Sequence, residues 1–321
     1  MKKDTGFDVA ALGELLIDFT ENGLSAQGNS LFEANPGGAP CNVLAMLKKL
    51  GHSCAFIGKA GDDILGRQLR QVAVEAGIDM THLVMDQESR TTLAFVKTAP
   101  NGDREFSFFR NPGADMLLTQ EEIPQEVVEN CGIFHFGTLS MTHEGVRQAT
   151  CQAIDWAKNG GALLSFDPNL RPPLWESLEE AKRQIGYGLG KCDILKIADN
   201  EIEFMTGETD FYKAAVMLRE KYPNIRLLNV TAGSQGSYSY YKDHWVFVPA
   251  LQLGGTIETT GAGDTFCACV LHYVLTHGLE GLTEENLREM LSFANAAAYL
   301  VTTKKGAIKS MPEQEEVEAL L

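Results

Sequence analysis

Basic residues and paired cysteines are scarce in this sequence. Its 321 residues include 27 lysines and arginines but 43 aspartates and glutamates, so the formal net charge is −16. A surface this acidic repels phosphate backbones and anionic headgroups, so we expect the protein to bind neither nucleic acid nor a membrane surface. Small anionic ligands are not excluded, because they need only a local group of backbone amides or a metal ion.

The seven cysteines include no C-x-x-C pair, and the only close pair is Cys267 and Cys269. This spacing suits neither a structural zinc site nor a redox motif. Most lie in apolar runs, as Cys54 and Cys131 do, which is typical of small buried side chains. We therefore expect reduced thiols in a reducing compartment.

Long apolar segments are also missing. No run reaches the ~18–20 residues that a membrane span needs. Asp4, Asp8 and Glu14 interrupt the segment after the basic residues 2–3, so no signal peptide is predicted. A hydrophobic content of 44% is ordinary for a globular chain of this length. We expect a soluble, cytoplasmic protein.

Several catalytic motifs are absent. The sequence has no P-loop, no G-x-G-x-x-G after its first predicted strand and no G-x-S-x-G. His143-Glu144 lacks the second histidine of a zinc peptidase motif. Hydride transfer, serine hydrolysis and zinc peptidase chemistry are therefore disfavoured.

Short apolar runs alternate with helix-like segments along most of the chain. This repeat predicts a mainly parallel sheet covered by helices. The predicted strands are residues 9–17, 54–58, 133–136, 163–166, 194–197 and 227–230. The predicted helices are residues 40–50, 62–76, 144–158, 179–190, 211–221, 264–277 and 284–303.

Two predicted hairpins interrupt this repeat. Residues 91–97 and 104–110 flank a turn at 101–103, and a second hairpin joins 238–241 to 245–248. A small antiparallel sheet projecting from the main body explains the first hairpin, and a surface hairpin without a role is the alternative.

The densest chemical signal is the segment Glu258-Thr-Thr-Gly-Ala-Gly-Asp264, which precedes a long apolar helix. Glycines at a helix start turn backbone N–H groups toward one point, where the helix dipole favours an anion. A carboxylate beside such an anion hole is the pair that phosphoryl transfer to an alcohol needs. The alternative is an N-capping aspartate with glycines that serve only the turn.

Five motifs in register resemble those of the ribokinase-like carbohydrate kinases, and three more resemble the fructokinase branch. The family motifs are residues 36–42, 58–66, 231–236, 258–266 and 305–310, and the branch motifs are 110–115, 166–175 and 201–207. The resemblance implies an α/β fold, a three-layer α/β/α sandwich with a mainly parallel sheet. It further implies a single domain over residues 1–321 with a small discontinuous β-sheet lid from about 14–35 and 90–110. Exposed aromatics on the hairpin at 91–110 indicate that one lid face closes over the sugar and the other forms a homodimer.

The resemblance also assigns site residues. Asp264 is the general base, and the anion hole is formed by Gly261, Ala262 and Gly263. The substrate-binding candidates are Asp18, at the end of the first strand, Gly38, Asn42, Arg110 and Arg171. The nucleotide-binding candidates are Thr231, Gly233, Gly236 and Asn295. Each assignment has a structural alternative. Asp18, Gly38 and Asn42 could serve only in a turn or a helix start, and the nucleotide loop could be a plain turn. Arg171 could form a structural ion pair, Arg110 could be a solvated side chain, and Asn295 could be a packing amide.

The cation motifs depart from the family pattern. Glu258 replaces the usual aspartate, so binding of a monovalent cation such as K⁺ is open; its other candidate ligands are Thr260, Val301, Lys304, Gly306 and Ser310. In the N-x-x-E motif Ala198 replaces the asparagine and leaves Glu201 as the magnesium candidate. Helix capping is the alternative role for this acidic segment.

We therefore expect a kinase that uses ATP and Mg²⁺ to convert D-fructose to D-fructose 6-phosphate. One alternative is a 2-keto-3-deoxygluconate kinase or another sugar kinase of the family. A catalytically silent family member with a regulatory or scaffold role is an alternative of a different class.

Overall fold

The computed structural model describes residues 6–98 and 104–321, which fold around a nine-stranded sheet. The strand order is β13-β12-β11-β10-β9-β8-β1-β4-β5. In this order, every strand from β11 through β1 to β5 is parallel to its neighbours in that stretch. Strands β12 and β13 add an antiparallel edge beside β11. The bounds are β1 Val9–Leu12, β4 Cys54–Gly61, β5 Asp79–Asp86, β8 Ile133–Gly137, β9 Leu163–Asp167, β10 Ile194–Ala198, β11 Leu227–Thr231, β12 Gly236–Tyr241 and β13 His244–Pro249.

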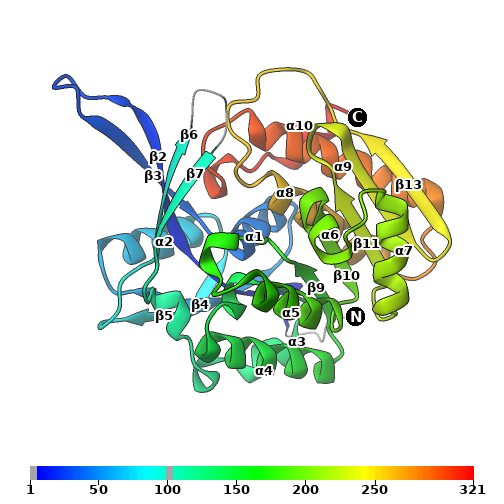
Figure 1. Cartoon of the computed structure of the whole chain (residues 1–321), viewed down its shortest axis with the longest axis horizontal. Helices are drawn as coiled ribbons and strands as arrows, with labels where there is room; N and C mark the ends of the chain where they lie inside the picture. Colours follow the sequence, from blue (N-terminus) through cyan, green and yellow to red (C-terminus); the bar gives the residue numbers. More distant parts are fainter. Residues whose placement is uncertain (1–5, 99–103) are drawn as a thin grey trace.

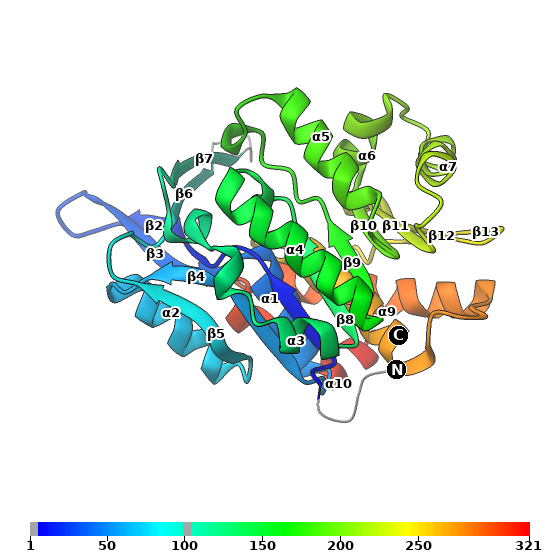
Figure 2. The same ribbon diagram turned by 90° about the horizontal axis from the view of Figure 1, so that it is seen from below.

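Helices cover both faces of this sheet, as the two orthogonal views show (Figures 1 and 2). One face carries α1 Ala39–Lys49, α2 Ile64–Glu75, α8 Ala262–His277, α9 Glu284–Thr302 and α10 Gln314–Glu318. The other carries α3 Gln125–Asn130, α4 Glu144–Gly160, α5 Leu178–Leu189, α6 Asp199–Thr206 and α7 Phe211–Lys221. The predicted three-layer α/β/α sandwich is confirmed.

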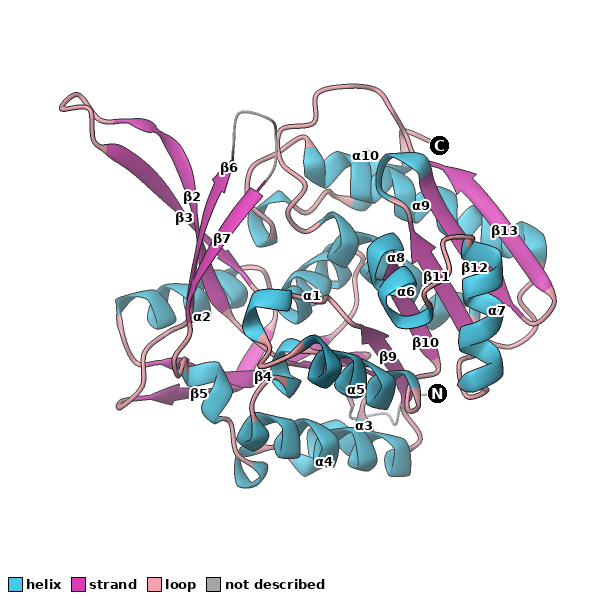
Figure 3. Cartoon of the chain, viewed as in Figure 1, coloured by secondary structure: helices cyan, strands magenta, loops and turns pink. Residues whose placement is uncertain are grey.

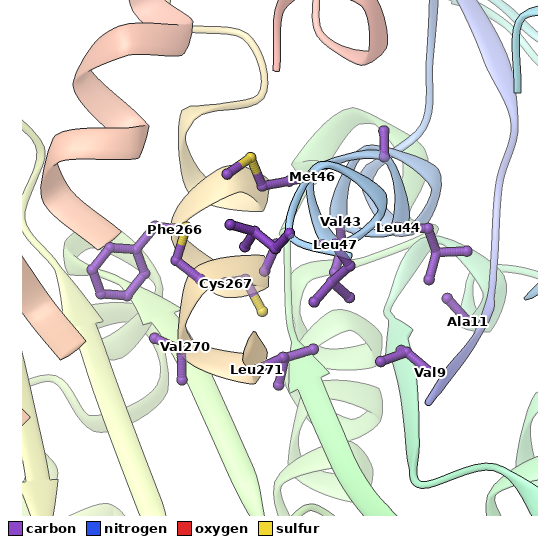
Figure 4. Close-up of a cluster of buried hydrophobic side chains, with 14 of the residues drawn as sticks. Val9, Ala11, Val43, Leu44, Met46, Leu47, Phe266, Cys267, Val270 and Leu271 are labelled. Atoms are coloured by element: carbon purple, nitrogen blue, oxygen red, sulfur yellow. The ribbon is translucent and has the colours of Figure 1, made fainter. Parts of the chain in front are cut away.

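Strand alternation divides the core into two layers. In β1, Val9 and Ala11 pack with the α1 and α8 layer, whereas Ala10 and Leu12 pack with the α3 and α4 layer. Figure 4 shows Val9 and Ala11 beside side chains of α1 and α8, which are apolar on their facing sides. Burial on both sides explains why the parallel strands are almost continuously hydrophobic.

The first predicted strand, residues 9–17, is wrong as a single element. The chain leaves the large sheet after Leu12, and β2 (Leu16–Leu24) begins a separate sheet. The break is at Gly13, where an added Cβ would lie 2.5 Å from Cγ of Pro40 in α1. Asp18 is therefore not at the end of the first strand but in the first half of β2.

The small sheet contains four strands in the order β3-β2-β6-β7 within the described residues (Figure 3). It adds β3 Ser30–Gly37, β6 Leu93–Thr98 and β7 Arg104–Phe109 to β2. The predicted antiparallel hairpin is confirmed as β6 and β7, β2 and β3 form a second antiparallel hairpin, and β2 and β6 join the two hairpins in parallel. The predicted turn at 101–103 lies outside the described residues.

All seven cysteine thiols are free, and all but Cys151 are buried. None of the helices within residues 6–98 and 104–321 is long and apolar enough to span a membrane.

Candidate active site

A polar cavity of about 250 Å³ lies between the small sheet and the carboxyl ends of the central strands. It is next to β1, where the strand order reverses between β8 and β4, which is where open α/β sheets bind ligands. Its wall is formed by Glu14, Leu16, Asp18, Gly38, Ala39, Asn42, Val96, Phe108, Leu139, Asn169, Arg171, Lys196, Thr259, Thr260, Gly261, Gly263 and Asp264. Residues far apart in the sequence thus meet at one site.

The N-terminus of α8 forms one wall of this cavity. Gly261 precedes the helix with φ +79°, a conformation that favours glycine, and no side chain caps the helix there. Amides in a first helical turn have no partner within the helix, so they can donate to a bound anion. The amide of Ala262 donates to the backbone oxygen of Thr259 at 3.3 Å, whereas Gly261 and Gly263 line the cavity. The loop from Gly261 to Gly263 therefore has the geometry of an anion hole.

Asp264 lies in the first turn of α8 and faces the cavity. Asn42 of α1 donates a hydrogen bond from Nδ2 to Oδ2 of Asp264 at 2.7 Å, which orients the carboxylate. Burial raises the pKa of Asp264 to about 6, although Asn42 and the charges of Lys196 and Arg171 lower it. A carboxylate with this pKa is ionised at neutral pH and can accept a proton.

Lys196 lines the cavity and forms a buried ion pair with Asp167. Nζ of Lys196 lies 3.1 Å from Oδ2 of Asp167, on the neighbouring strands β10 and β9. Burial acts to lower the pKa of Lys196, but the charges of Asp167, Glu201 and Asp264 outweigh it and hold the pKa above its ordinary value. The ammonium therefore stays charged. Sequence reasoning missed Lys196, although a lone lysine in an otherwise apolar strand was a usable signal.

Asp18, Gly38 and Glu14 line another part of the cavity wall. Gly38 has φ +129°, and an added Cβ would lie 2.3 Å from the backbone oxygen of Glu14, so only glycine fits there. Oε1 of Glu14 accepts a hydrogen bond from the amide of Ala39 at 2.7 Å, and burial raises the pKa of Glu14 to about 7. Glu14 was also missed as a cavity residue. Carboxylates on this wall can accept hydroxyl hydrogen bonds from a sugar.

Arg171 follows β9 and lines the cavity as the sequence predicted, but Arg110 does not. Instead, Nε of Arg110 donates to Oδ2 of Asp115 at 2.7 Å, and its two terminal nitrogens donate to Thr142 and to the backbone oxygen of Leu139. Arg110 and Asp115 have side chains only 2% exposed. Arg110 therefore anchors the end of β7 to the main body. This position agrees neither with the predicted contact with the sugar nor with the alternative of a solvated side chain.

The predicted nucleotide residues lie at the end of β11 and beyond it, outside this cavity. An added Cβ on Gly236 would lie 2.2 Å from the backbone oxygen of Val248, so β13 packing explains this glycine. Asn295 accepts from Ser237 at 2.8 Å and donates to the backbone of Val248 and Pro249. These contacts favour the packing role of Asn295. Roles for Thr231 and Gly233 in nucleotide binding stay predictions.

Glu258 joins two loops that carry the predicted monovalent-cation ligands. Its carboxylate accepts from the hydroxyl of Thr260 and from the amide of Gly306 at 3.2 Å. The amides of Ile257 and Glu258 also donate to the backbone oxygen of Thr302. The longer side chain of Glu258 thus reaches the C-terminal loop that includes Lys304 and Ser310. This loop follows the end of α9, which contains Val301. Cation binding there stays a prediction.

Glu201 does not point into the cavity. Its carboxylate accepts from the amide of Leu170 at 2.7 Å and from the amide of Ala198 at 2.8 Å. Both oxygens are thus engaged by backbone, and burial raises the pKa of Glu201. Among the described residues, no group of three His, Cys, Asp or Glu side chains could hold a metal ion. The geometry favours the capping role, and Glu201 does not fit as a direct ligand of Mg²⁺.

Comparison with protein-family models gives a match over almost the whole chain. The model described as pfkB family carbohydrate kinase matches residues 7–314. "Fructokinase-1" of Zea mays is 42% identical over 315 residues, which cover 98% of this chain and 97% of the relative. "Probable fructokinase-2" of Arabidopsis thaliana is also 42% identical, over 98% of this chain and 95% of the relative.

Comparison with solved structures also finds fructokinases that cover almost the whole chain. A fructokinase from Xylella fastidiosa with bound ATP is 29% identical and has a TM-score of 0.88, with 98% of both chains covered. A fructokinase from Vibrio cholerae O395 with fructose, ADP and calcium ion bound is 28% identical, with a TM-score of 0.87 over 98% of this chain and 99% of that one. Every residue of the cavity wall lies within the matched part of the chain.

Proposed function

Because this chain belongs to the pfkB family of carbohydrate kinases, we propose that it is a fructokinase. It transfers the γ-phosphoryl group of ATP to the primary hydroxyl of D-fructose and releases D-fructose 6-phosphate and ADP. The observation that carries this proposal is the position of Asp264, an ionised carboxylate in the same helical turn as an anion hole and open to a polar cavity.

Each wall of the cavity has a role in this reaction. Asp18 accepts hydrogen bonds from sugar hydroxyls, Gly38 lets the sugar approach the backbone, and Asn42 orients Asp264. Asp264 then accepts the proton of the primary hydroxyl as its oxygen attacks phosphorus. The amides of Gly261, Ala262 and Gly263 stabilise the charge on the transferred group, together with Arg171.

ATP binds on the α8 side of the cavity, near Thr231 and Gly233. Mg²⁺ neutralises phosphate charge when it is bound, and it needs few protein ligands because phosphates and waters supply most of its coordination sphere. The Vibrio cholerae relative, solved with fructose, ADP and calcium ion, supports a divalent cation at this step. A cytoplasmic location, inferred from the sequence, stays a prediction.

The substrate is tested by measuring ADP release with ketoses, aldoses and sugar acids at equal concentrations. We expect the highest kcat/KM with D-fructose. A preference for 2-keto-3-deoxygluconate or for another sugar would overturn the assignment of fructose but not of kinase activity. No ADP release with any acceptor would favour the silent regulatory or scaffold alternative.

The small sheet acts in this proposal as a lid that also forms a homodimer. Asp18, Val96 and Phe108 face the cavity, so lid closure would exclude water from the reacting phosphate. The opposite face carries an aromatic cluster in which Phe95 contacts the rings of Phe19, Phe32 and Phe109 within 5.4 Å. Phe32 and Phe109 are 42% and 62% exposed. Strand alternation predicts Phe106 on the same face as Phe108, but its side chain lies outside the described part of the chain.

A second copy of the chain is the proposed partner for this aromatic face, because the same surface on two subunits forms a closed symmetric contact. We expect a dimer at micromolar concentration by sedimentation velocity, and a monomer for Phe109→Lys. Phe247→Lys, which alters an exposed aromatic on β13, is the matched control and should stay dimeric. A monomeric wild-type protein would contradict the prediction.

Glu258 provides a test of monovalent-cation activation. If the loops that Glu258 joins also bind K⁺, turnover in potassium chloride should exceed turnover in tetramethylammonium chloride at equal ionic strength. The ratio should approach one in Glu258→Ala, which lacks the carboxylate. Equal wild-type rates in the two salts would mean that this chain does not use the cation.

A further inference from the structure

Lys196 is a buried cation that the roles given above do not use. Its side chain is 8% exposed, and its ammonium is held by Asp167 at 3.1 Å. It nevertheless lines the cavity, together with Gly263 and Asp264. A lysine that served only to neutralise Asp167 would not need to reach the cavity wall.

The ammonium of Lys196 lies directly against the anion hole. A Cβ added to Gly263 would lie 3.0 Å from Nζ of Lys196, so the lysine approaches closely because residue 263 has no side chain. The N-terminal amides of α8 and this ammonium therefore converge on one region of the cavity. Positive groups from a helix start and from β10 are both suited to bind an anion.

The surrounding charges keep this ammonium in place. Asp167 pairs with it from β9, Glu201 attracts it from the start of α6, and Asp264 attracts it from α8. Arg171 is the other cation at the cavity wall, and His135 of β8 is kept neutral because burial lowers its pKa to about 4. Three carboxylates thus face one lysine, and a bound phosphate would place its negative charge on the cavity side of that lysine.

We propose that Lys196 binds the phosphoryl group that is transferred, with Asp167 as the residue that positions its ammonium. This rests on the proposed kinase function. During the step, the sugar oxygen forms a bond to phosphorus as the bond from phosphorus to the bridging oxygen breaks. The proton of the sugar hydroxyl goes to Asp264, and the bonding electrons leave with ADP. Lys196 offsets the charge on the phosphoryl oxygens throughout.

The test compares the binding of ADP and of a non-hydrolysable ATP analogue, AMP-PNP, by calorimetry without sugar. In Lys196→Met, affinity for AMP-PNP should fall about 10- to 100-fold, the range expected for a hydrogen bond to a charged group, while affinity for ADP stays within about twofold. Lys196→Arg should recover part of the loss. Since no sugar is present, an incorrect assignment of fructose would not affect this result.

Two further variants separate this role from a structural one. Lys59→Met is the matched control, since Lys59 is another buried lysine, paired with Glu122 at 2.8 Å outside the cavity, and should leave both affinities unchanged. If Lys196→Met does not fold, Lys196→Met/Asp167→Asn also removes the charge of the ion-pair partner and should show the same selective loss. Equal weakening of ADP and AMP-PNP, or no change in either, would overturn the proposal.

Discussion

Asp264→Asn is expected to lower turnover by about 10²–10⁴-fold, the range typical of a lost general base. The amide keeps the shape of the side chain but cannot accept the proton of the sugar hydroxyl. The first turn of α8 is otherwise unaltered, so affinity for ADP should change little. Steady-state kinetics with a coupled assay of ADP release measure the effect, and near wild-type turnover would show that Asp264 is not the base.

The pH dependence of the wild-type enzyme gives an independent check on the same residue. Because the pKa of Asp264 is raised to about 6, the carboxylate is ionised above this pH and protonated below it. The value of kcat/KM should therefore fall as the pH decreases through about 6, with a limiting slope of tenfold per pH unit. A flat profile down to pH 5 would contradict the assignment.

Arg110→Met is expected to lower the free energy of unfolding by about 3–5 kcal/mol, because it leaves Asp115 as an unpaired buried charge. The two side chains are only 2% exposed, and no water can replace the guanidinium easily. Urea denaturation followed by circular dichroism measures the loss. Arg110→Met/Asp115→Leu removes both charges and should recover most of it.

Arg67→Met is the matched control for this loss. Arg67 pairs with Asp62 at 2.6 Å, but its side chain is 58% exposed, so its removal should cost about 0–1 kcal/mol. A loss for Arg110→Met no larger than that of Arg67→Met would show that the buried pair does not anchor β7. An unchanged KM for fructose in a folded Arg110→Ala variant would show that this anchor does not support sugar binding.

Local sequence was sufficient where neighbouring residues determine the geometry. The glycines at 261 and 263 and the acidic residue at 264 predicted the helix start that begins α8, because this feature depends on one turn of backbone, and anion binding there stays a prediction. The alternation of apolar runs and helical segments likewise predicted the three layers of the sandwich, because the pattern of adjacent residues shows it. The break at Gly13 was missed because residues 9–17 form one mostly apolar run, and the packing of Pro40, 27 positions later in the sequence, close to residue 13 is visible only in the tertiary structure.

Only the tertiary structure decided how charged groups pair. Asn42 reaches Asp264 across 222 positions, and Lys196 meets Asp167 because β10 and β9 are neighbours in the sheet. In the same way, Arg110 is turned from the cavity by Asp115 and the backbone of Leu139. A sequence pattern identifies which residues carry charge, but the packing of distant elements decides which partner a buried charge has. The free energy needed to bury an unpaired charge is larger than the local preferences of neighbouring residues, so the tertiary partner determines where the side chain lies.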